Sequence, residues 1–285
     1  PPPTAASQSL HKPTPLTDAT GVVFAHPGRF RRIVSLAPSL TEEIFALGDG
    51  NALLADTIFG LYPAAARTKA KIGSTLAPDL GLIVSLHPDL VVATEDGNRR
   101  TTVEQLRRLG LRVFVVGQSS TFRDIKSNFR ELGRLLGRES SARKVLREAE
   151  RQVALVRTRV SQEPRVRVFF ELQQTPLMSA NDDTFIGEAL RDAGATDILG
   201  AVAARYPRVS EESVLQSNPG AILVANEQAD PARAVSDWTR FPSLSAARQR
   251  HIYLVPSHIF DSPTPTNFAA AVRIAAQLLH PEARP

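Results

Sequence analysis

Short apolar runs alternate with amphipathic stretches of helical period over most of the chain. Parallel strands need a crossover connection, which is usually a helix, so this alternation predicts parallel βα units. In the first half, the predicted strands cover 31–36, 52–55, 90–94 and 113–116, and the predicted helices begin at Ser39 and cover 78–86 and 102–109.

The start of the first helix shows a possible capping box. Ser39 and Glu42 have the spacing at which each side chain can satisfy a backbone N–H at the helix start. Gly48 follows the last apolar position and is typical of a residue that ends a helix. We therefore expect a helix from Ser39 to just before Gly48.

The alternation stops between residues 121 and 163, where only helical periodicity remains, interrupted at Gly137. The stretch 140–162 alternates Val and Ala with Arg and Glu, and Pro164 ends it. A helix of about 22 residues would be roughly 33 Å long, which is the width of a small domain. This stretch predicts a rigid spine between two lobes.

After the spine, the alternation resumes with predicted strands at 165–172, 221–225 and 251–255. One sequence pattern occurs in both halves: "DLGLIVSLHPDLVVATEDG" from Asp79 and "SEESVLQSNPGAILVANEQ" from Ser210. Each contains a short helix, a turn at a proline, an apolar strand and a polar loop. The predicted helices of the second half follow a loop near 178–184 and cover 211–216 and 267–279.

The predicted fold class is α/β, with two similar lobes of mostly parallel sheets joined by one long rigid helix. We expect a tether and entry segment at 1–29, an N-terminal lobe at 30–137, a connecting helix at 138–164 and a C-terminal lobe at 165–285. The first 15 or so residues have the composition of a flexible tether left after processing or trimming.

Composition narrows the possible chemistry. The 285 residues are 42% hydrophobic and 22% charged, as in soluble globular proteins, and no apolar run is long enough to span a bilayer. There is no cysteine, which excludes disulfides, thiolate zinc sites and cysteine nucleophiles. The sequence also lacks G-x-G-x-x-G, the Walker lysine loop, H-E-x-x-H and G-x-S-x-G. We predict no catalytic residues and no resident metal; an enzyme on a similar two-lobed scaffold is the less favoured alternative.

The net charge of +5 does not indicate a nucleic-acid partner. Arginines are spread along the predicted helices among glutamates, and only three tyrosines and one tryptophan accompany them. A nucleic-acid binder would concentrate its positive charge in a stripe with aromatic residues between. We interpret these arginines as solvated helix faces.

Topology predicts where a ligand would bind. In open parallel sheets, ligands gather outside the carboxyl ends of the strands, and a cleft between two lobes is a common small-molecule site. The candidate loops are 37–39, 56–62, 94–100, 173–181, 226–228 and 257–266.

Several stretches resemble a known family. "RRIVSLAPSLTEEIFALG", "LYP", "KIGSTLAPDLGLIVSLHPDLVVA", "GNRRTTVEQLRRLGLRVFVV" and "SEESVLQSNPGAILV" resemble, in order from about Arg31, the BtuF-like cobalamin-binding proteins and their relatives. These are the substrate-binding proteins of ABC importers for corrinoids, haem and ferric siderophores. The resemblance implies a class III periplasmic binding protein fold that closes modestly, a monomer that delivers its ligand to a permease, and a location in the periplasm or lipid-anchored outside the cell membrane.

The resemblance also implies ligand-binding positions. Cobalamin binders clamp the corrin with aromatic side chains from both lobes, and Phe59 and Tyr206 fall on such positions, with Tyr62 nearby. Thr75 and Thr94 stand where the cobalamin protein has tryptophan, and Leu177 stands at another aromatic position. Loss of a large ring removes stacking worth on the order of 1 kcal/mol beyond burial.

Polar residues surround these positions. The predicted rim contains Glu95, Asp96, Asn98, Arg99, Arg100, Arg205 and Arg208. Arginine pairs with carboxylates in two-point geometry, so we hypothesise a bulky ligand with anionic edges. In the alternative, Arg99 and Arg100 only begin a solvated helix with a capping box at Thr101 and Glu104.

Two further residues have both a functional and a structural interpretation. His258 follows a predicted strand and is a candidate axial ligand for cobalt or iron, although a lone loop histidine is more often exposed or hydrogen-bonded. Trp238 is interpreted as packing.

The resemblance further implies one acidic permease-docking residue on each lobe. Glu212 matches this position in the second lobe, whereas the first lobe has Gly81 there and Asp79 two residues earlier. Because a pair of surface charges contributes modestly, this departure does not exclude docking.

The sequence thus predicts an ABC-importer binding protein for a metal chelate, with cobalamin or another corrinoid favoured. The alternative ligands are haem and a ferric siderophore. The protein would need no cofactor of its own, because the cobalt or iron chelate is its cargo.

Overall fold

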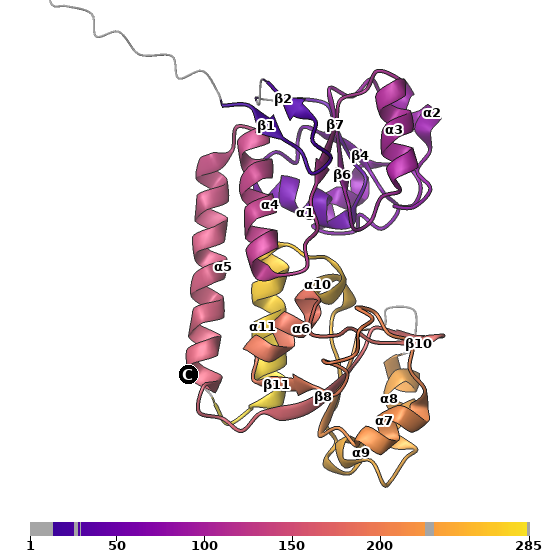
Figure 1. The fold of residues 1–285 in the computed structure, drawn as a ribbon, viewed down its shortest axis with the longest axis vertical. Helices are drawn as coiled ribbons and strands as arrows, with labels where there is room; N and C mark the ends of the chain where they lie inside the picture. Colours follow the sequence, from indigo (N-terminus) through magenta and orange to yellow (C-terminus); the bar gives the residue numbers. More distant parts are fainter. Residues whose placement is uncertain (1–13, 26–27, 29, 226–230, 284–285) are drawn as a thin grey trace, which may run out of the picture.

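The computed structural model describes residues 14–25, 28, 30–225 and 231–283. Most of the predicted tether and the predicted loop 226–228 lie outside these residues. The described residues form two α/β lobes, which are the upper and lower halves of Figure 1. This two-lobed arrangement confirms the predicted fold class.

The N-terminal lobe contains a parallel sheet with the strand order β5-β4-β3-β6-β7. Alternate strand residues enter two hydrophobic clusters, one on each face of the sheet, as expected for a parallel sheet covered by helices on both sides. The strands are β3 (Ile33–Ser35), β4 (Leu53–Asp56), β5 (Ala70–Lys71), β6 (Leu90–Thr94) and β7 (Val113–Val116). The helices are α1 (Pro38–Ala46), α2 (Leu80–Ser85), α3 (Arg100–Arg108) and α4 (Phe122–Leu135), with the 3-10 turn Ala64–Thr68 and the small hairpin β1 (Leu16–Thr17) and β2 (Val23–Phe24).

The C-terminal lobe repeats this plan with the strand order β11-β8-β12-β13, also parallel. Its strands are β8 (Val166–Glu171), β11 (Ala195–Asp197), β12 (Ala221–Val224) and β13 (Ile252–Leu254), and β9 (Gln173–Gln174) and β10 (Leu177–Met178) form a hairpin. Its helices are α6 (Phe185–Asp192), α7 (Glu211–Ser217), α8 (Pro231–Thr239), α9 (Ser245–Gln249), α10 (Ser257–Asp261) and α11 (Pro265–Leu279).

The predicted spine is helix α5 (Glu139–Val160), which has 22 residues. It runs beside α4 at one end and α11 at the other (Figure 1). Leu146 enters a core cluster of the N-terminal lobe, whereas Val153 and Val156 enter a cluster of the C-terminal lobe. The helix therefore contributes to both cores. No helix among the described residues is long and apolar enough to cross a membrane.

The repeated sequence pattern occupies equivalent positions in the two lobes, since α2–β6 corresponds to α7–β12. His87 and Asn218, each directly before a proline, have φ angles of 45° and 44°. The residue after each proline donates its amide to the central strand region, from Asp89 to the Arg32 carbonyl and from Gly220 to the Arg167 carbonyl, both at 2.9 Å. The sequence repeat is thus one helix–turn–strand unit used twice.

Both predicted capping boxes are wrong. Helix α1 begins one residue earlier, with Ala37 at the N-cap and no side-chain cap. Glu42 instead accepts hydrogen bonds from Ser262 and Asn267 of the other lobe, both at 2.7 Å.

The second box fails in a similar way, because α3 begins after Arg99 without a side-chain cap. Glu104 accepts a hydrogen bond from Arg100, four residues earlier, at 2.8 Å. In both cases the acidic side chain is bonded to other side chains and not to a backbone amide at the helix start.

Candidate functional site

A cavity of about 400 Å³ lies between the two lobes, next to the carboxyl ends of β3, β6 and β7. This is the place that the strand topology predicts for a ligand. It is lined from the N-terminal lobe by Ala37, Pro38, Ser39, Thr75, Thr94, Asp96, Gly97 and Ser119, and from the C-terminal lobe by Phe185, Arg205, Tyr206, Asp261 and Pro263.

The N-terminal side of the cavity is held in place by Asn98, which is only 9% exposed. Its Nδ2 donates to the carbonyls of Leu36 at 3.0 Å and Thr75 at 2.9 Å. Its Oδ1 accepts from the Thr94 amide at 2.9 Å, and Thr94 Oγ1 accepts from the Gly97 amide at 3.0 Å. Asn98 does not line the cavity, but it fixes the positions of Thr75 and Thr94, which do.

The loop that carries Phe59 is anchored by Lys71. Its Nζ donates to Asp56 Oδ1 at 2.6 Å and to the Gly60 carbonyl at 2.8 Å. Burial raises the pKa of the Asp56 carboxyl, although the nearby Lys71 acts in the opposite direction. Because Asp56 is completely buried, this pair fixes the base of the loop while Phe59 stays 54% exposed at its tip.

Arg205 on the C-terminal side reaches across the cavity to the other lobe. Its Nη2 donates to Ser120 Oγ at 2.7 Å, and its Nη1 lies 4.0 Å from Asp96 Oδ1. Asp96 is itself held by the Ser119 amide at 2.7 Å. Arg205 therefore both lines the cavity and links the lobes.

Loops of both lobes carry exposed apolar side chains, and one of them, Tyr206, lines the cavity. Tyr206 is 42% exposed and lies under the Arg205 guanidinium, 5.8 Å from the ring centroid. The N-terminal loops expose Ile58, Phe59, Leu61 and Leu76, and the C-terminal loop exposes Val202 and Tyr206. The cavity lining itself combines apolar groups with a few charged ones, which is typical of small-molecule sites.

Four predicted ligand residues line this cavity: Thr75, Thr94, Arg205 and Tyr206. Others lie elsewhere. Arg99 is the exposed N-cap of α3, and Arg208 is exposed and forms a β-bridge with Met178. Leu177 packs against the core cluster of the C-terminal lobe that contains Phe169.

Tyr62 and His258 lie together, away from the cleft cavity. Their rings stack with centroids 3.7 Å apart and an interplanar angle of 11°. Tyr62 comes from the N-terminal lobe and His258 from α10, so the pair is a further contact between the lobes. Both residues line a separate cavity next to α1.

The predicted docking residues occupy matching helix ends. Asp79 is the N-cap of α2 and accepts from the Leu82 amide at 2.9 Å, and Ser210 is the N-cap of α7. Gly81 and Glu212 each stand two residues after these caps and are exposed or partly exposed. Backbone and Ser210 hydrogen bonds lower the pKa of the Glu212 carboxyl.

Sequence reasoning missed Ser119, Ser120 and Phe185. The signal for the serines was present, because they follow the predicted strand 113–116 and thus the carboxyl end of β7. Trp238 is buried and donates to Glu171 Oε2 at 2.6 Å, which confirms the packing interpretation.

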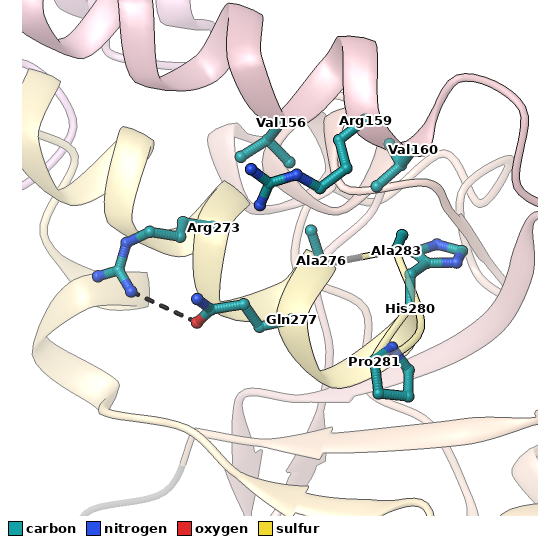
Figure 2. Close-up of a pocket in the computed structure, with 9 residues that line it drawn as sticks. All are labelled: Val156, Arg159, Val160, Arg273, Ala276, Gln277, His280, Pro281 and Ala283. Atoms are coloured by element: carbon teal, nitrogen blue, oxygen red, sulfur yellow. Dashed lines mark hydrogen bonds between the residues drawn. The ribbon is translucent and has the colours of Figure 1, made fainter. Parts of the chain in front are cut away.

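A further cavity, of about 320 Å³, lies between the last turns of α5 and α11 (Figure 2). Arg159, Arg273 and His280 are among its lining residues, and Arg273 contacts Gln277. No predicted site residue lines this cavity, and it is remote from the strand ends that form the cleft. Among the described residues, no group of three or more His, Asp or Glu side chains could hold a metal ion.

Comparisons with known proteins point to the same family of folds. A family model described as "Periplasmic binding protein" matches residues 33–259. The vitamin B12-binding protein of Vibrio parahaemolyticus is 26% identical over 243 residues, which cover 85% of this chain and 87% of the relative. That of Pectobacterium atrosepticum is 26% identical over 253 residues, covering 87% and 88%.

Solved structures agree with these matches. The periplasmic vitamin B12-binding protein BtuF of Vibrio cholerae superposes with a TM-score of 0.78 at 26% identity, covering 90% of this chain and 99% of that one. The haem-binding protein RhuT of Roseiflexus has a TM-score of 0.80 at 22% identity, covering 89% and 99%, and at that identity shows the shared fold alone.

Proposed function

This chain belongs to the periplasmic binding protein family and is BtuF-like, and on that premise we propose that it is the substrate-binding protein of an ABC importer. It would capture a metal chelate in the cleft between its lobes and release it unchanged to a permease. The favoured ligand is cobalamin or another corrinoid, because the vitamin B12-binding proteins match over most of the chain.

The observation that carries this proposal is the cavity between the lobes, with Tyr206 and Arg205 on one wall and Thr75 and Thr94 on the other. Tyr206 supplies an aromatic face to it, whereas exposed Phe59 of the other lobe stands outside the lining. Aromatic faces and apolar loops suit a large, flat macrocycle, and the few polar groups would fix its orientation.

Ligand entry requires the lobes to separate, because a cobalamin is much larger than the cavity of about 400 Å³. The contacts of Arg205 with Ser120 and Asp96 hold the cleft closed. A ligand that enters must replace these contacts, and an anionic group on the ligand would do so with two-point hydrogen bonds.

Haem or a carboxylate siderophore is the second candidate, and Arg205 is the observation that favours it. Thr75 and Thr94 stand at two positions where the cobalamin protein has tryptophan. The cleft therefore offers less ring stacking to a corrin than the cobalamin protein would. A propionate or other carboxylate would pair with the Arg205 guanidinium through two-point hydrogen bonds.

The importer partner and location are also parts of this proposal. Glu212 and Asp79, at matching helix ends of the two lobes, would face cationic residues of the permease. The protein would act as a monomer in the periplasm, or lipid-anchored on the outside of the cell membrane.

Titration of the purified chain with cyanocobalamin, haemin and a ferric hydroxamate tests the proposal, with ligand absorbance and heat as readouts. Saturable one-to-one binding of cyanocobalamin is the expected result. Binding of haemin instead would keep the importer function and change the ligand, whereas silence toward all three chelates would contradict the proposal.

Arg205→Ala and Arg208→Ala form a matched pair for locating the site. Both remove an arginine from the same loop, but only Arg205 lines the cavity. Arg205→Ala should lower the affinity for an anionic chelate by about tenfold to a hundredfold, because a charge-assisted hydrogen bond is lost. Arg208→Ala should bind like the wild type; equal losses would place the ligand elsewhere on this face.

A further inference from the structure

The two long helices α4 and α5 carry an excess of positive charge. From Phe122 to Val160, the sequence contains eleven lysines and arginines and five aspartates and glutamates, which leaves a net charge of +6. The whole chain has a net charge of +5. The excess positive charge of the protein therefore lies on this pair of helices and the turn between them.

The outward side of α5 is a basic surface. The buried residues of α5 recur every three or four positions and enter the cores of the two lobes, so the residues between them point outward. Figure 1 shows α5 at the outer edge of the molecule, with α2 and α7 on the opposite side. We define the basic face as the exposed residues Arg143, Lys144, Arg147, Glu148, Arg151 and Leu155 of this helix.

Little of the positive charge on the basic face is neutralised. Glu148 accepts hydrogen bonds from Arg151 at 2.7 Å and 3.0 Å, and this pair leaves the other cations without a carboxylate. Within the part of the chain that the structure describes, Arg143, Lys144 and Arg147 form no ion pair. Glu150, at the flank of the helix, pairs with Lys126 of α4 at 2.7 Å instead.

The spacing of the arginines adds to this imbalance. Arg143, Arg147 and Arg151 follow one another at intervals of four residues, which places them side by side on the helix surface. Like charges at this spacing destabilise a helix, and they lie well within the screening length of about 10 Å at 0.1 M salt. Their fields therefore add, and an anionic partner would relieve the repulsion.

The composition and length of α5 favour a lipid surface over a nucleic acid. The helix contains no aromatic residue, whereas nucleic-acid-binding surfaces place aromatic residues among the basic ones. Its 22 residues make a helix about 33 Å long, which can lie along a bilayer. Leu155 is 51% exposed, and the stems of arginine and lysine are apolar, so the basic face can also bury hydrocarbon among lipid headgroups.

We propose that the basic face of α5 binds reversibly to the surface of a bilayer that contains anionic phospholipids. The lipid phosphates supply the negative charge that Arg143, Lys144 and Arg147 lack within the described chain. Each lysine or arginine near such a surface strengthens binding about fivefold. Because α2 and α7 lie on the opposite side of the molecule, their exposed helix ends stay accessible in the bound state.

Co-sedimentation of the full chain with vesicles tests this surface and needs no cleft ligand. One set of vesicles contains phosphatidylcholine alone, and the other contains equal parts of phosphatidylcholine and phosphatidylglycerol. At low salt we expect binding to the mixed vesicles and none to phosphatidylcholine, and the binding should be lost at high salt. Binding to neither set, or equal binding to both, would overturn the proposal.

Duplex DNA, titrated under the same conditions, distinguishes a lipid surface from another polyanion. We expect the DNA to bind more weakly than the mixed vesicles, because the basic face lacks aromatic residues. Tighter binding of the DNA would overturn the assignment to lipid.

Two double variants with the same loss of charge then locate the binding. Arg143→Gln with Arg147→Gln should lower the affinity for the mixed vesicles about tenfold or more. Arg108→Gln with Arg112→Gln changes two exposed arginines at the end of α3 and beyond it, on the other side of the N-terminal lobe, and should lower it less than about twofold. Equal losses in the two variants would contradict the assignment to α5.

Glutamine is a good helix former, so all four substitutions at exposed positions should leave the fold unchanged. Circular dichroism of both variants checks this before the vesicle measurement.

Discussion

The two lobes share one sheet plan but build their sides of the cleft differently. In each lobe the first strand is central, the second pairs on one side and the later strands pair on the other; only the N-terminal sheet adds β5. On the N-terminal side, Asn98 ties three backbone segments together beneath Thr75 and Thr94. On the C-terminal side, an exposed loop carries Arg205 and Tyr206 toward the opposite lobe.

The N-terminal lobe therefore supplies a fixed surface, and the C-terminal lobe supplies an adjustable one. The fixed surface is defined by hydrogen bonds within its own lobe. The backbone of the second surface is also held within its own lobe, by Asn181 and Ser179, but the Arg205 side chain makes its polar contacts with the partner lobe, and those contacts can be exchanged for contacts with a ligand. Equivalent substitutions in the two lobes test this distinction.

Asn98→Ala should have the largest effect. It leaves two carbonyls without a donor and the Thr94 amide without an acceptor, and we expect the free energy of unfolding to fall by about 3 kcal/mol. Urea unfolding measures this loss. Arg99→Ala, at the exposed neighbouring position, is the control and should change stability by less than about 0.5 kcal/mol.

Asn181 provides the counterpart in the C-terminal lobe. Its Nδ2 donates to the Val202 carbonyl at 2.8 Å and its Oδ1 accepts from the Asp183 amide at 2.9 Å. Asn181→Ala should therefore lose less stability, about 2 kcal/mol. A larger loss in Asn181→Ala than in Asn98→Ala would show that the N-terminal surface is not the more tightly held one.

Glu42→Gln should have the next largest effect on stability, because Glu42 joins the two lobes. Burial raises the pKa of Glu42 from 4.5 to about 7, while Ser262 and Asn267 act in the opposite direction. The folded state thus holds this proton more tightly than the unfolded state, so the wild type loses stability as pH rises from about 4.5 to about 7.

The glutamine variant lacks this titration but keeps the side-chain shape. Relative to the wild type, its stability should increase by about 2 kcal/mol between pH 5 and pH 8. Thermal or urea unfolding at both pH values measures the difference. Parallel pH profiles for the two proteins would show that Glu42 does not carry the effect.

The smallest expected effect concerns permease docking, where Glu212 of one lobe corresponds to Gly81 of the other. Glu212→Ala should weaken binding to a solubilised corrinoid permease about twofold to fivefold at low salt, because an exposed ion pair contributes up to about 1 kcal/mol. Surface plasmon resonance at two salt concentrations would measure it, and the loss should shrink at high salt.

Asp79→Ser separates charge from capping in the N-terminal lobe. Serine is the residue that caps α7 at the equivalent position, so the helix keeps its N-cap while the lobe loses the acid. If Asp79 substitutes for the missing acid at Gly81, this variant should lose as much affinity as Glu212→Ala. An unchanged affinity would assign docking to the C-terminal lobe alone.

Much of the fold follows from local pattern. The predicted strands 90–94 and 113–116 coincide with β6 and β7, and the predicted 22-residue helix matches α5 in length. These elements have strong periodicity and clear end signals. The short elements β5, α9 and α10 were not predicted, because two to five residues give too little periodicity.

The candidate site was harder to predict, because its contacts join residues that are distant in the sequence. The capping-box spacing at Ser39 and Glu42 is a genuine local signal, but the partners of Glu42 lie in the other lobe. Tyr62 and His258 were assigned to the same ligand site as Tyr206, and only the packing of α10 against the N-terminal lobe shows that they line a different cavity. Spacing alone carries no information about such contacts.

Helix α5 has a consequence for the time that a ligand stays bound. Because its two halves are embedded in the cores of different lobes, a wide opening would require the helix to bend or one core to loosen. Spontaneous opening should therefore be rare and ligand dissociation slow. Rapid unloading would then need mechanical work from outside the protein, and a membrane machine that grips both lobes and pulls them apart would set the rate of release.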